Sequence, residues 1–502
     1  MRLSNLARSA FALLMIAALL SVNPKAVAAV DYTIGEPTIT CATESQVTFA
    51  LSQAANALPT GDVITIKVWW YTNLMSSNSG DFPLGDSSMG VSLPEGALDG
   101  EYTYAAYINN SPTAAKSGGF SVICAPGGYT PVVPSRVLDS RSTGGTLSAG
   151  ETRSVQVAGH NGVPTSGASA VVLNVTVTET TTAGYLTVSP TGTTRPTASN
   201  LNWSPGVTIP NAVTVKLGTD GKIDLYQSGP GTAQVIVDVS GYYRDGVVEA
   251  AGGYTPLSPA RILDTRTDGG KLTAGESRDL QISGAGGIPA SNVSSVVLNV
   301  TVSETTTGGY LSVNPTGTAN TWISNLNWAK AGVTIPNSVV VKVGDGGKVT
   351  LLQSGPGTAQ VIVDVAGYFL GGTPTEDGMF VALPPARLMD TRQTALVPIA
   401  GGTDLWKSFA GLNGFYFVRA SAAVVNVTVT QTMAGGYLTV FPTAPPYGPP
   451  PTASNLNWSA PGTTVPNLVI VRLGGNGTLT FHNGSPGGTH IIADFAGYYI
   501  GD

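Results

Sequence analysis

The 502-residue sequence is poor in charge, cysteine and histidine, and each shortage excludes a class of protein. Charged residues make up 11% of the chain and the formal net charge is −6, without the basic stripe that neutralises nucleic-acid phosphates. Three histidines and two cysteines offer few metal ligands. No segment shows the 3.6-residue periodicity of an amphipathic helix. These absences argue against a helical fold, a nucleic-acid partner, a metal site and a bound cofactor.

The first 28 residues are predicted to be a secretory signal peptide. Arg2 and Arg8 supply positive charge, residues 10–20 are apolar, and residues 26–28 (AVA) provide a small-residue cleavage site. No later stretch approaches the roughly 20 apolar residues of a transmembrane helix. We therefore expect a mature chain that begins near Ala29, has no transmembrane segment, and is secreted or held at the cell surface.

The two cysteines, Cys41 and Cys124, are expected to form a structural disulfide. Export to an oxidising compartment favours this pairing. A redox pair or a metal site is less favoured, because there is no CxxC spacing and no neighbouring histidine.

Residues 29–125 are predicted to form an immunoglobulin-like β-sandwich closed by that disulfide. Segments 63–71, 101–107 and 119–124 alternate apolar and polar residues and are separated by Gly, Pro, Asn and Ser, as in short antiparallel strands. The cysteine and tryptophan spacing of immunoglobulin domains is only loosely matched.

The remainder of the chain consists of three copies of one sequence block, expected at residues 126–246, 251–372 and 377–502. Four of the recurring motifs appear in the first copy as PSRVLDSR (134–141), LNVTV (173–177), SNLNW (199–203) and VIVDVSGYY (235–243). Arg136, Arg261 and Arg387 are 125 and 126 residues apart. This spacing is far longer than the 20–50 residues of a solenoid repeat, so each copy is expected to be a complete domain.

Each copy is predicted to be an all-β domain. In the first copy, strands are expected at 171–178, 185–188, 212–217, 223–227 and 235–239, with a tight turn at 220–221. Two stacked sheets would bury the alternating apolar faces, which favours a β-sandwich or jelly-roll-like domain; barrel and trefoil topologies remain open. The linkers 244–252 and 370–378 are short, so we expect a semi-rigid rod of domains.

The repeated block resembles a module of secreted and cell-surface proteins from actinobacteria and other environmental bacteria. The resemblance covers roughly residues 128–499 and rests on PxRxLDTR, LNVT, GYLTVxP, SxLN and DVxGYF in constant order. It implies a non-catalytic extracellular appendage. The third copy departs most, with Met389 inside the first motif and a proline-rich insertion at 444–451.

One set of charged residues recurs in every copy. We predict that these residues form structural ion pairs, because an unpaired charge buried in an apolar strand is costly. Multivalent ligand or cation binding is the alternative, and catalysis is least favoured. The set comprises Arg136, Asp139, Arg141 and Asp238; Arg261, Asp264, Arg266 and Asp364; and Arg387, Asp390, Arg392 and Asp494.

A recurring tyrosine and tryptophan in each copy have two interpretations. Their rings could fill the core, which the sequence favours, or they could form a carbohydrate-binding platform by stacking on sugar rings. The residues are Tyr185, Trp203, Tyr310, Trp328, Tyr437 and Trp458.

Asparagines and histidines are interpreted as structural. Asn174, Asn299 and Asn426 lie inside predicted strands, where their side chains are expected to satisfy neighbouring backbone groups rather than carry glycans. The histidines have no counterparts between copies, and His482 and His490 are expected on a solvated surface.

These observations favour a non-catalytic structural or adhesive protein of the bacterial exterior that self-assembles into a layer, filament or stalk, or contacts other cell-surface proteins. The alternative is a multivalent protein that binds a carbohydrate or cell-wall polysaccharide. An enzyme in the N-terminal domain is disfavoured, because the sequence has no recognised nucleophile motif. That reading would require clustering of carboxylates such as Asp81, Asp86, Glu95 and Asp99.

Overall fold

The computed structural model confirms the all-β fold class. It describes the strands before residue 123 and then residues 127–244, 251–318, 323–372, 377–394, 397–408, 420–443, 450–475 and 477–501. The chain divides into two compact units, one holding most of the N-terminal strands and the other all three copies. Within the described residues, no helix is long and apolar enough to cross a membrane.

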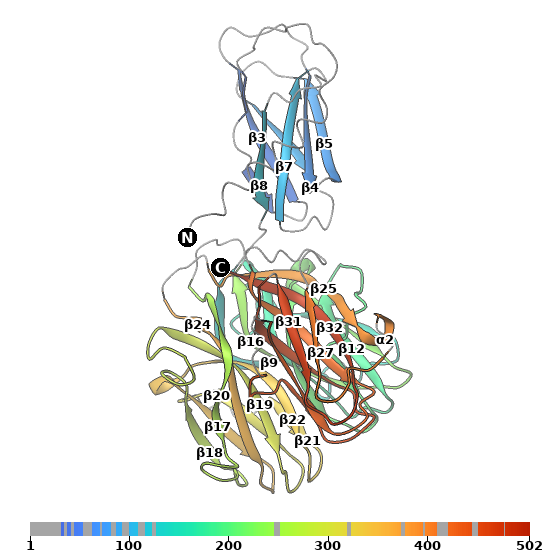
Figure 1. Cartoon of the computed structure of the whole chain (residues 1–502), viewed down its shortest axis with the longest axis vertical. Coiled ribbons are helices and arrows are strands. Elements are labelled where there is room, and N and C mark those ends of the chain that lie inside the picture. The colour runs from blue at the N-terminus through green and yellow to red at the C-terminus, as the bar shows by residue number, and fades with distance from the viewer. Residues whose placement is uncertain are drawn as a thin grey trace. The chain divides into compact units, whose positions relative to one another are not determined.

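The N-terminal unit contains two four-stranded sheets (Figure 1). In the first, β3 (Ser45–Gln53) pairs with β1 (Tyr32–Ile34), β2 (Thr38–Cys41) and β6 (Ser87–Ser92). The second has the order β5 (Asn73–Asp81), β4 (Val63–Trp70), β7 (Gly100–Ile108) and β8 (Lys116–Val122).

The first copy is built from two four-stranded antiparallel sheets. The inner sheet has the order β14 (Ile209–Lys216), β11 (Ala168–Thr178), β16 (Gln234–Arg244) and β9 (Tyr129–Asp139). The outer sheet has the order β10 (Thr152–Gln156), β15 (Lys222–Ser228), β12 (Gly184–Pro190) and β13 (Leu201–Trp203). A short 3-10 turn, η2 (Thr219–Gly221), lies at the expected tight turn. Strands β9, β10 and β13 were not predicted.

The second copy repeats this arrangement. Its inner sheet has the order β17 (Tyr254–Asp264), β24 (Gln360–Leu370), β19 (Val293–Ser303), β22 (Ile335–Lys342). Its outer sheet has the order β18 (Ser277–Gln281), β23 (Lys348–Ser354), β20 (Gly309–Pro315), β21 (Leu326–Trp328), with η3 (Asp345–Gly347) preceding β23.

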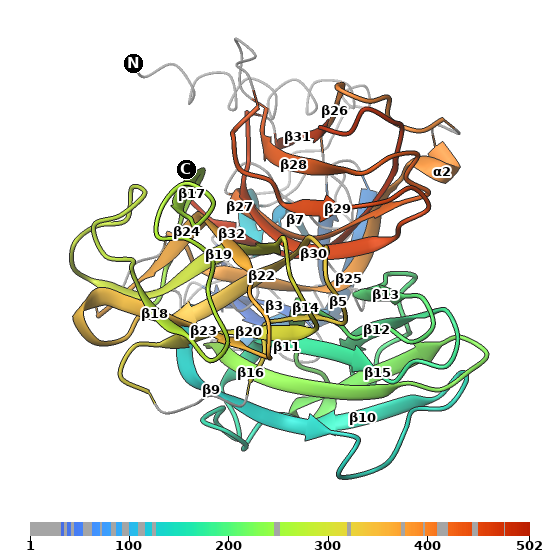
Figure 2. The same ribbon diagram turned by 90° about the horizontal axis from the view of Figure 1, so that it is seen from below.

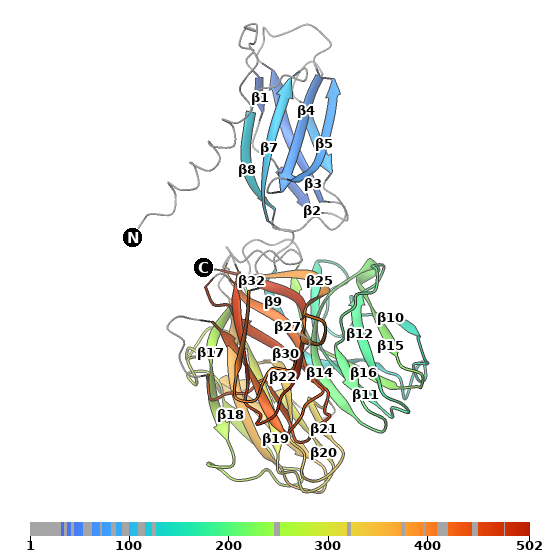
Figure 3. The ribbon, with the colours of Figure 1, turned by 45° about the vertical axis from the view of Figure 1, so that its right-hand side comes forward.

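The third copy has the same strand orders. The inner sheet has β25 (Phe380–Asp390), β32 (His490–Ile500), β27 (Ala420–Thr430), β30 (Val465–Arg472), and the outer has β26 (Asp404–Ser408), β31 (Thr478–Asn483), β28 (Gly436–Pro442), β29 (Leu456–Trp458). A single turn of helix, α2 (Thr391–Thr394), follows β25. Figure 3 shows the sheets of the three copies alongside one another.

The inner strand β11 explains how the copies pack, because both of its faces are buried. Val171, Leu173 and Val175 point into the core of the first copy. The alternate residues Ala170 and Val172 belong to a second apolar cluster shared by all three copies. Each copy therefore has its own core and contributes the other face of its inner sheet to a common centre.

The expected rod of domains is wrong, because the three copies pack around that common centre (Figure 2). Their six four-stranded sheets give a propeller-like arrangement that the sequence did not predict. Short linkers permit a rod or a closed ring equally well. The apolar residues on the second face of each inner sheet decide between them, because a rod would leave those residues in water.

Backbone hydrogen bonds at the start of each copy help to join the copies. Gly127 and Phe380 exchange two hydrogen bonds, which link the first copy to the third. The Tyr129 amide donates to the Gly252 carbonyl, and the Tyr254 amide donates to the Gly378 carbonyl. The segments that enter the copies therefore lie against neighbouring copies in a cyclic order.

Candidate functional site

The recurring charged residues of the first copy come together where β9 pairs with β16. The β-register places Arg136 directly opposite Asp238. Arg136 Nε donates to Asp238 Oδ1 at 2.5 Å, and its Nη1 donates to Asp139 Oδ2 at 2.8 Å. Arg141 donates two hydrogen bonds to Asp139, from Nε to Oδ1 at 2.9 Å and from Nη2 to Oδ2 at 2.7 Å. All four side chains form one ion-pair network.

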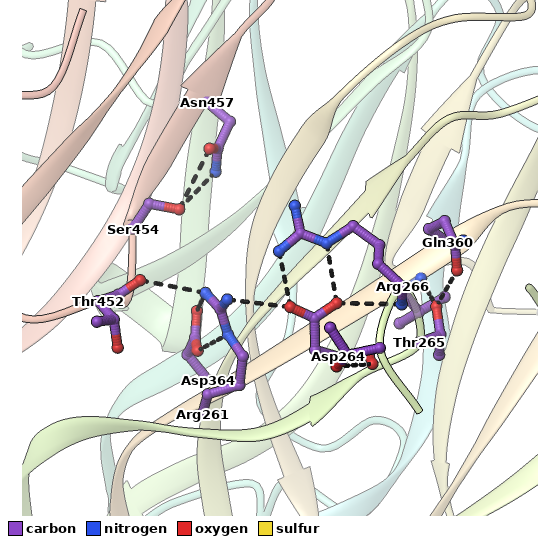
Figure 4. Close-up of polar contacts among 11 residues, drawn as sticks. Arg261, Asp264, Thr265, Arg266, Gln360, Asp364, Thr452, Ser454 and Asn457 are labelled. Atoms are coloured by element: carbon purple, nitrogen blue, oxygen red, sulfur yellow. Dashed lines mark hydrogen bonds and ion pairs between the residues drawn. The ribbon is translucent and has the colours of Figure 1, made fainter. Parts of the chain in front are cut away.

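The second copy has an equivalent network, shown in Figure 4. Arg261 Nε donates to Asp364 Oδ1 at 2.9 Å and its Nη1 to Asp264 Oδ2 at 3.2 Å. Arg266 forms the same two-bond contact with Asp264 as Arg141 forms with Asp139.

The third copy has the network again. Arg387 binds both Asp494 and Asp390, and Arg392 binds Asp390 with two hydrogen bonds. Met389 in the opening motif leaves these contacts in place and is itself buried in the core.

The two kinds of aspartate have opposite pKa shifts. Hydrogen bonds from Arg141 lower the pKa of Asp139 to about 2, and hydrogen bonds from Arg266 lower the pKa of Asp264 to about 2. Burial raises the pKa of Asp238 above its usual value and outweighs the contact with Arg136. The pKa of Asp494 is raised for the same reason. Such a buried carboxylate requires its arginine partner.

Two of the arginines also reach a neighbouring copy. Arg261 Nη2 donates to the Thr452 carbonyl at 3.3 Å, and Arg387 Nη2 donates to the Thr197 carbonyl at 2.8 Å. Asp494 Oδ2 accepts a hydrogen bond from the Ser199 amide at 3.1 Å. The ion-pair networks therefore lie beside the interfaces between copies and have protein groups as their partners.

Buried asparagines join each copy to the next. The side-chain Nδ2 of Asn337 donates to Asn174 Oδ1 at 2.9 Å. The side-chain Nδ2 of Asn174 donates to the Ser324 backbone carbonyl at 2.9 Å. Asn337 Oδ1 accepts from the Ala212 amide at 3.1 Å. The strand asparagine thus bonds to backbone as expected, but the backbone belongs to another copy.

Sequence reasoning missed the second asparagine of each pair. Asn211, Asn337 and Asn467 lie in a recurring IPN or VPN segment at the start of an inner strand, and all three are buried. These asparagines recur inside strands and not in turns, and this recurrence was a sequence signal that they have a structural role. It could not reveal that the partners lie in different copies.

The centre of the ring is a cluster of six aromatic side chains, two from each copy. Three close ring pairs each cross from one copy to another. Their centroid separations are 4.3 Å for Tyr129–Phe369, 4.3 Å for Tyr243–Phe380 and 4.4 Å for Tyr254–Tyr499. These distances suit favourable aromatic contact.

The tryptophans are not available for sugar stacking. Trp203, Trp328 and Trp458 are 6%, 5% and 4% exposed and belong to the three domain cores. Each indole N–H donates to a backbone carbonyl within its own copy. The carbohydrate-platform hypothesis is therefore wrong for the tryptophans, because their faces are covered by core side chains.

The predicted tyrosines lie outside the cores. Tyr185 is 38% exposed and Tyr437 is 39% exposed, while Tyr310 is partly exposed. Each is the second residue of its strand, β12, β20 or β28, and lies on the solvent-facing side of the outer sheet. These three remain candidates for a surface contact.

The expectation that His482 and His490 lie on a solvated surface is wrong for His490. His490 is buried, and its Nδ1 lies 3.0 Å from Thr391 Oγ1. His482 Nδ1 lies 2.7 Å from Asp404 Oδ1 at the outer sheet of the third copy. Among the residues that the structure describes, no group of three or more His, Cys, Asp or Glu side chains could hold a metal ion.

The predicted disulfide and the N-terminal carboxylates are not placed by the structure. Cys41 ends strand β2, whereas Cys124 lies outside the described residues, as do Asp86, Glu95 and Asp99. The disulfide stays a prediction.

A cavity lies between the second and third copies beside the buried asparagine and aspartate. Its volume is about 10 Å³, and its lining includes Asn299, Asp364 and Ser454. A space of this size holds about one water molecule. It is too small to bind a sugar or a metabolite.

Comparisons with known proteins give no relative on which a function could rest. No protein-family model and no curated protein matches the sequence. The chain is similar to trypsin-activated alpha-2-macroglobulin from Escherichia coli, with 13% identity, 87% of this chain and 28% of that chain covered, and a TM-score of 0.17.

Two further solved structures are similar at the same level. The native conformation of E. coli alpha-2-macroglobulin is 13% identical, covers 84% of this chain and 26% of its own, and has a TM-score of 0.15. This chain spans about a quarter of the length of those two chains. The triple jelly roll fold and turret assembly of an archaeal virus is 12% identical, with 75% and 90% covered and a TM-score of 0.15. At these TM-scores the similarity supports neither a shared fold nor a shared function.

Proposed function

We propose that the protein is a secreted, non-catalytic structural or adhesive protein of the bacterial exterior. The observation that carries this proposal is the use of the recurring charged residues. In all three copies the Arg and Asp side chains fixed by the opening and closing motifs contact one another or the backbone of a neighbouring copy. Residues shared by every copy therefore serve folding and packing, as expected of a scaffold module.

Self-association of such a protein would use surfaces other than the interfaces between copies. Those interfaces close on themselves after three copies, and a closed ring does not propagate into a filament. Contacts that build a layer or stalk would involve the solvent-facing outer sheets or the N-terminal unit. Other cell-surface proteins are the alternative partners.

Light scattering coupled to size-exclusion chromatography, with negative-stain imaging, tests this proposal on residues 29–502 over a wide concentration range. Ordered polymers or sheets are expected as the concentration rises. A strict monomer that also fails to bind bacterial cells would overturn the structural and adhesive reading.

Carbohydrate binding is the second candidate function, favoured by the outer sheet of the third copy. Trp406 on β26 is 64% exposed and Tyr437 on β28 is 39% exposed. The β-register places both on the solvent-facing side, the same side as the Asp404–His482 pair. Exposed rings on the same face as a carboxylate–histidine pair offer stacking and hydrogen bonding together.

The other copies lack this arrangement. The position of Trp406 is occupied by Ser154 in the first copy and Asp279 in the second. A glycan array tests the candidate with the mature chain, Trp406→Ser, and the control Val133→Ser, which removes an exposed apolar residue of the first copy. Binding lost only in Trp406→Ser supports a sugar site; binding unaffected by that change excludes this surface.

We also propose that each copy is a jelly roll and that the N-terminal unit is immunoglobulin-like. The strand orders β9-β16-β11-β14 and β10-β15-β12-β13 support the first assignment, since two four-stranded sheets with these crossovers are typical of jelly rolls. The pairing of β5-β4-β7-β8 beside a sheet centred on β3 supports the second. An experimental structure of the mature chain tests both.

A further inference from the structure

The three interfaces between copies use the same pair of faces in cyclic order. Between the first and second copies, Asn337 donates to Asn174 at 2.9 Å. Between the second and third, Asn467 donates to Asn299 at 2.8 Å. Between the third and first, Asn211 donates to Asn426 at 2.7 Å. Each copy thus offers one face to its predecessor and a different face to its successor.

The supporting hydrogen bonds follow the same cycle. The other oxygen acceptors are the carbonyls of Ser324, Ser454 and Ser199, each bonded by the strand asparagine of the adjacent copy. The side-chain oxygens of the second set of asparagines accept backbone amides from the adjacent copy at 2.8–3.1 Å. Every interface therefore has the same polar pattern.

The interface between the third and first copies has no linker. The linkers join the first copy to the second and the second to the third, so the third and first copies meet only through their surfaces. Asn426 still bonds to the Ser199 carbonyl at 2.6 Å, and Leu468 still bonds to Asn211 at 3.1 Å. The surfaces, and not the connecting chain, determine how two copies pack.

The buried asparagines make this packing selective. Asn211 and Asn467 have no exposed surface and Asn337 is 1% exposed. A different face packed against them would leave amide and carbonyl groups buried without partners, which is costly. The aromatic pairs at the centre add apolar contact across the same interfaces.

We propose that each copy is a trimerisation module whose partner is another copy of the same module, recognised in trans as well as within one chain. In this protein each of the three copies binds the other two, so all three interfaces are occupied within one chain. The inference concerns the interfaces between copies and holds whether or not the protein has the structural role proposed above.

The test uses the full mature chain with protease sites placed within 245–250 and 373–376. After cleavage at both sites, the three fragments are expected to remain one particle with the mass of the intact chain. Mixing labelled and unlabelled cleaved protein then measures exchange of fragments. Separation into independent fragments at micromolar concentration would overturn the proposal.

Two matched variants test the role of the asparagine pair in the cleaved protein. Asn211→Leu removes hydrogen bonds to the third copy, and association is expected to weaken about 10- to 100-fold. Asn483→Leu is the control, because Asn483 is equally buried but bonds to Ile399, Ala400 and Gly487 within its own copy.

The control variant is expected to lower thermal stability without raising fragment exchange. Asn211→Ser, a smaller change, is measured in parallel in case the leucine variant fails to fold. Equal exchange in Asn211→Ser and wild type would contradict a recognition role for the asparagine pair.

Discussion

The phenol oxygens of Tyr243 and Tyr499 lie 2.5 Å apart and hydrogen-bond across the interface between the first and third copies. Both rings are fully buried, and both follow the glycine of a closing motif. In the second copy the same position is Phe369, which has no hydroxyl. The central aromatic cluster therefore contains one hydrogen-bonded pair of tyrosine hydroxyls, at a position where the second copy has phenylalanine.

Removing one of these hydroxyls should be costly, whereas removing that of Tyr129 should not. Tyr499→Phe leaves the Tyr243 hydroxyl buried without its partner, so we expect a loss of about 1–2 kcal/mol in unfolding free energy. Within the described residues the Tyr129 hydroxyl is buried and has no hydrogen-bond partner. Tyr129→Phe is expected to be neutral or slightly stabilising. Chemical denaturation of both variants checks this, and equal effects would contradict it.

Substitution of the glycine in the closing motif should also destabilise the protein. A Cβ added to Gly367 would come within 2.3 Å of the Tyr254 hydroxyl oxygen and 2.5 Å of its ring carbon. Gly367→Ala would displace that ring from the central cluster, with an expected cost of about 1–3 kcal/mol. Gly475→Ala is the control, because an added Cβ there meets nothing within 4 Å. Thermal unfolding compares the two, and similar melting temperatures would argue against a packing role for Gly367.

Period-two alternation within the repeated motifs was sufficient to predict most of the strands of each copy, because it marks a sheet with a buried face. Strand β13 escaped prediction because Leu201–Trp203 is too short to show a period. Strand β9 escaped it because its motif contains two prolines, which usually argue against a strand interior. Its edge position in the inner sheet explains why they are tolerated.

The closed ring could not be predicted from local pattern. Ala170 and Val172 alternate with the core residues of β11 and are also apolar. This pattern indicates only that both faces of β11 are buried. What covers the second face is set by contacts with residues more than a hundred positions away, such as Asn337. Similarly, recurrence of Arg387 and Asp494 indicated a pair, but not that Arg387 also reaches Thr197.

The Arg387–Asp494 pair should contribute more to the stability of the third copy than the Arg392–Asp390 pair. Arg387→Met removes the partner of Asp494, whose side chain is 3% exposed, and an expected loss of about 3 kcal/mol follows from the unpaired charge. Arg392→Met removes an arginine that is 38% exposed, and the buried Asp390 keeps Arg387 as a partner, so about 1 kcal/mol is expected. Denaturant unfolding at pH 7 measures both.

The double variant Arg387→Met, Asp494→Asn is the matched control. Neutralising the aspartate removes the buried charge, so part of the lost stability should return. No recovery in the double variant would mean that the cost lies in the contact with Thr197 or in packing.

The contribution of Asp139 to the free energy of unfolding should depend on pH between about 4 and 2. Its pKa is lowered from 3.8 to about 2 in the folded protein, chiefly by the side-chain hydrogen bonds from Arg141. A lowered pKa means that the unfolded chain binds the proton more readily. The stabilisation is therefore fully present above pH 4 and is lost as the pH falls toward 2. Water screens the pair, so its size is on the order of 1 kcal/mol.

Asp139→Asn should thus be less stable than wild type at pH 7, and the difference should shrink as the pH approaches 2. Burial raises the pKa of Asp238 in both proteins, so acidification acts there in the opposite direction, and the loss of the Asp139 charge removes one of the smaller causes of that raised pKa. Asp268→Asn, at an exposed position on the turn after β17, is the control for replacing a carboxylate by an amide. Urea unfolding at pH 7, 4 and 2.5 gives the three free energies. A difference between wild type and Asp139→Asn that stays constant across this range would show that the variant acts through packing and not through the charge of the carboxylate.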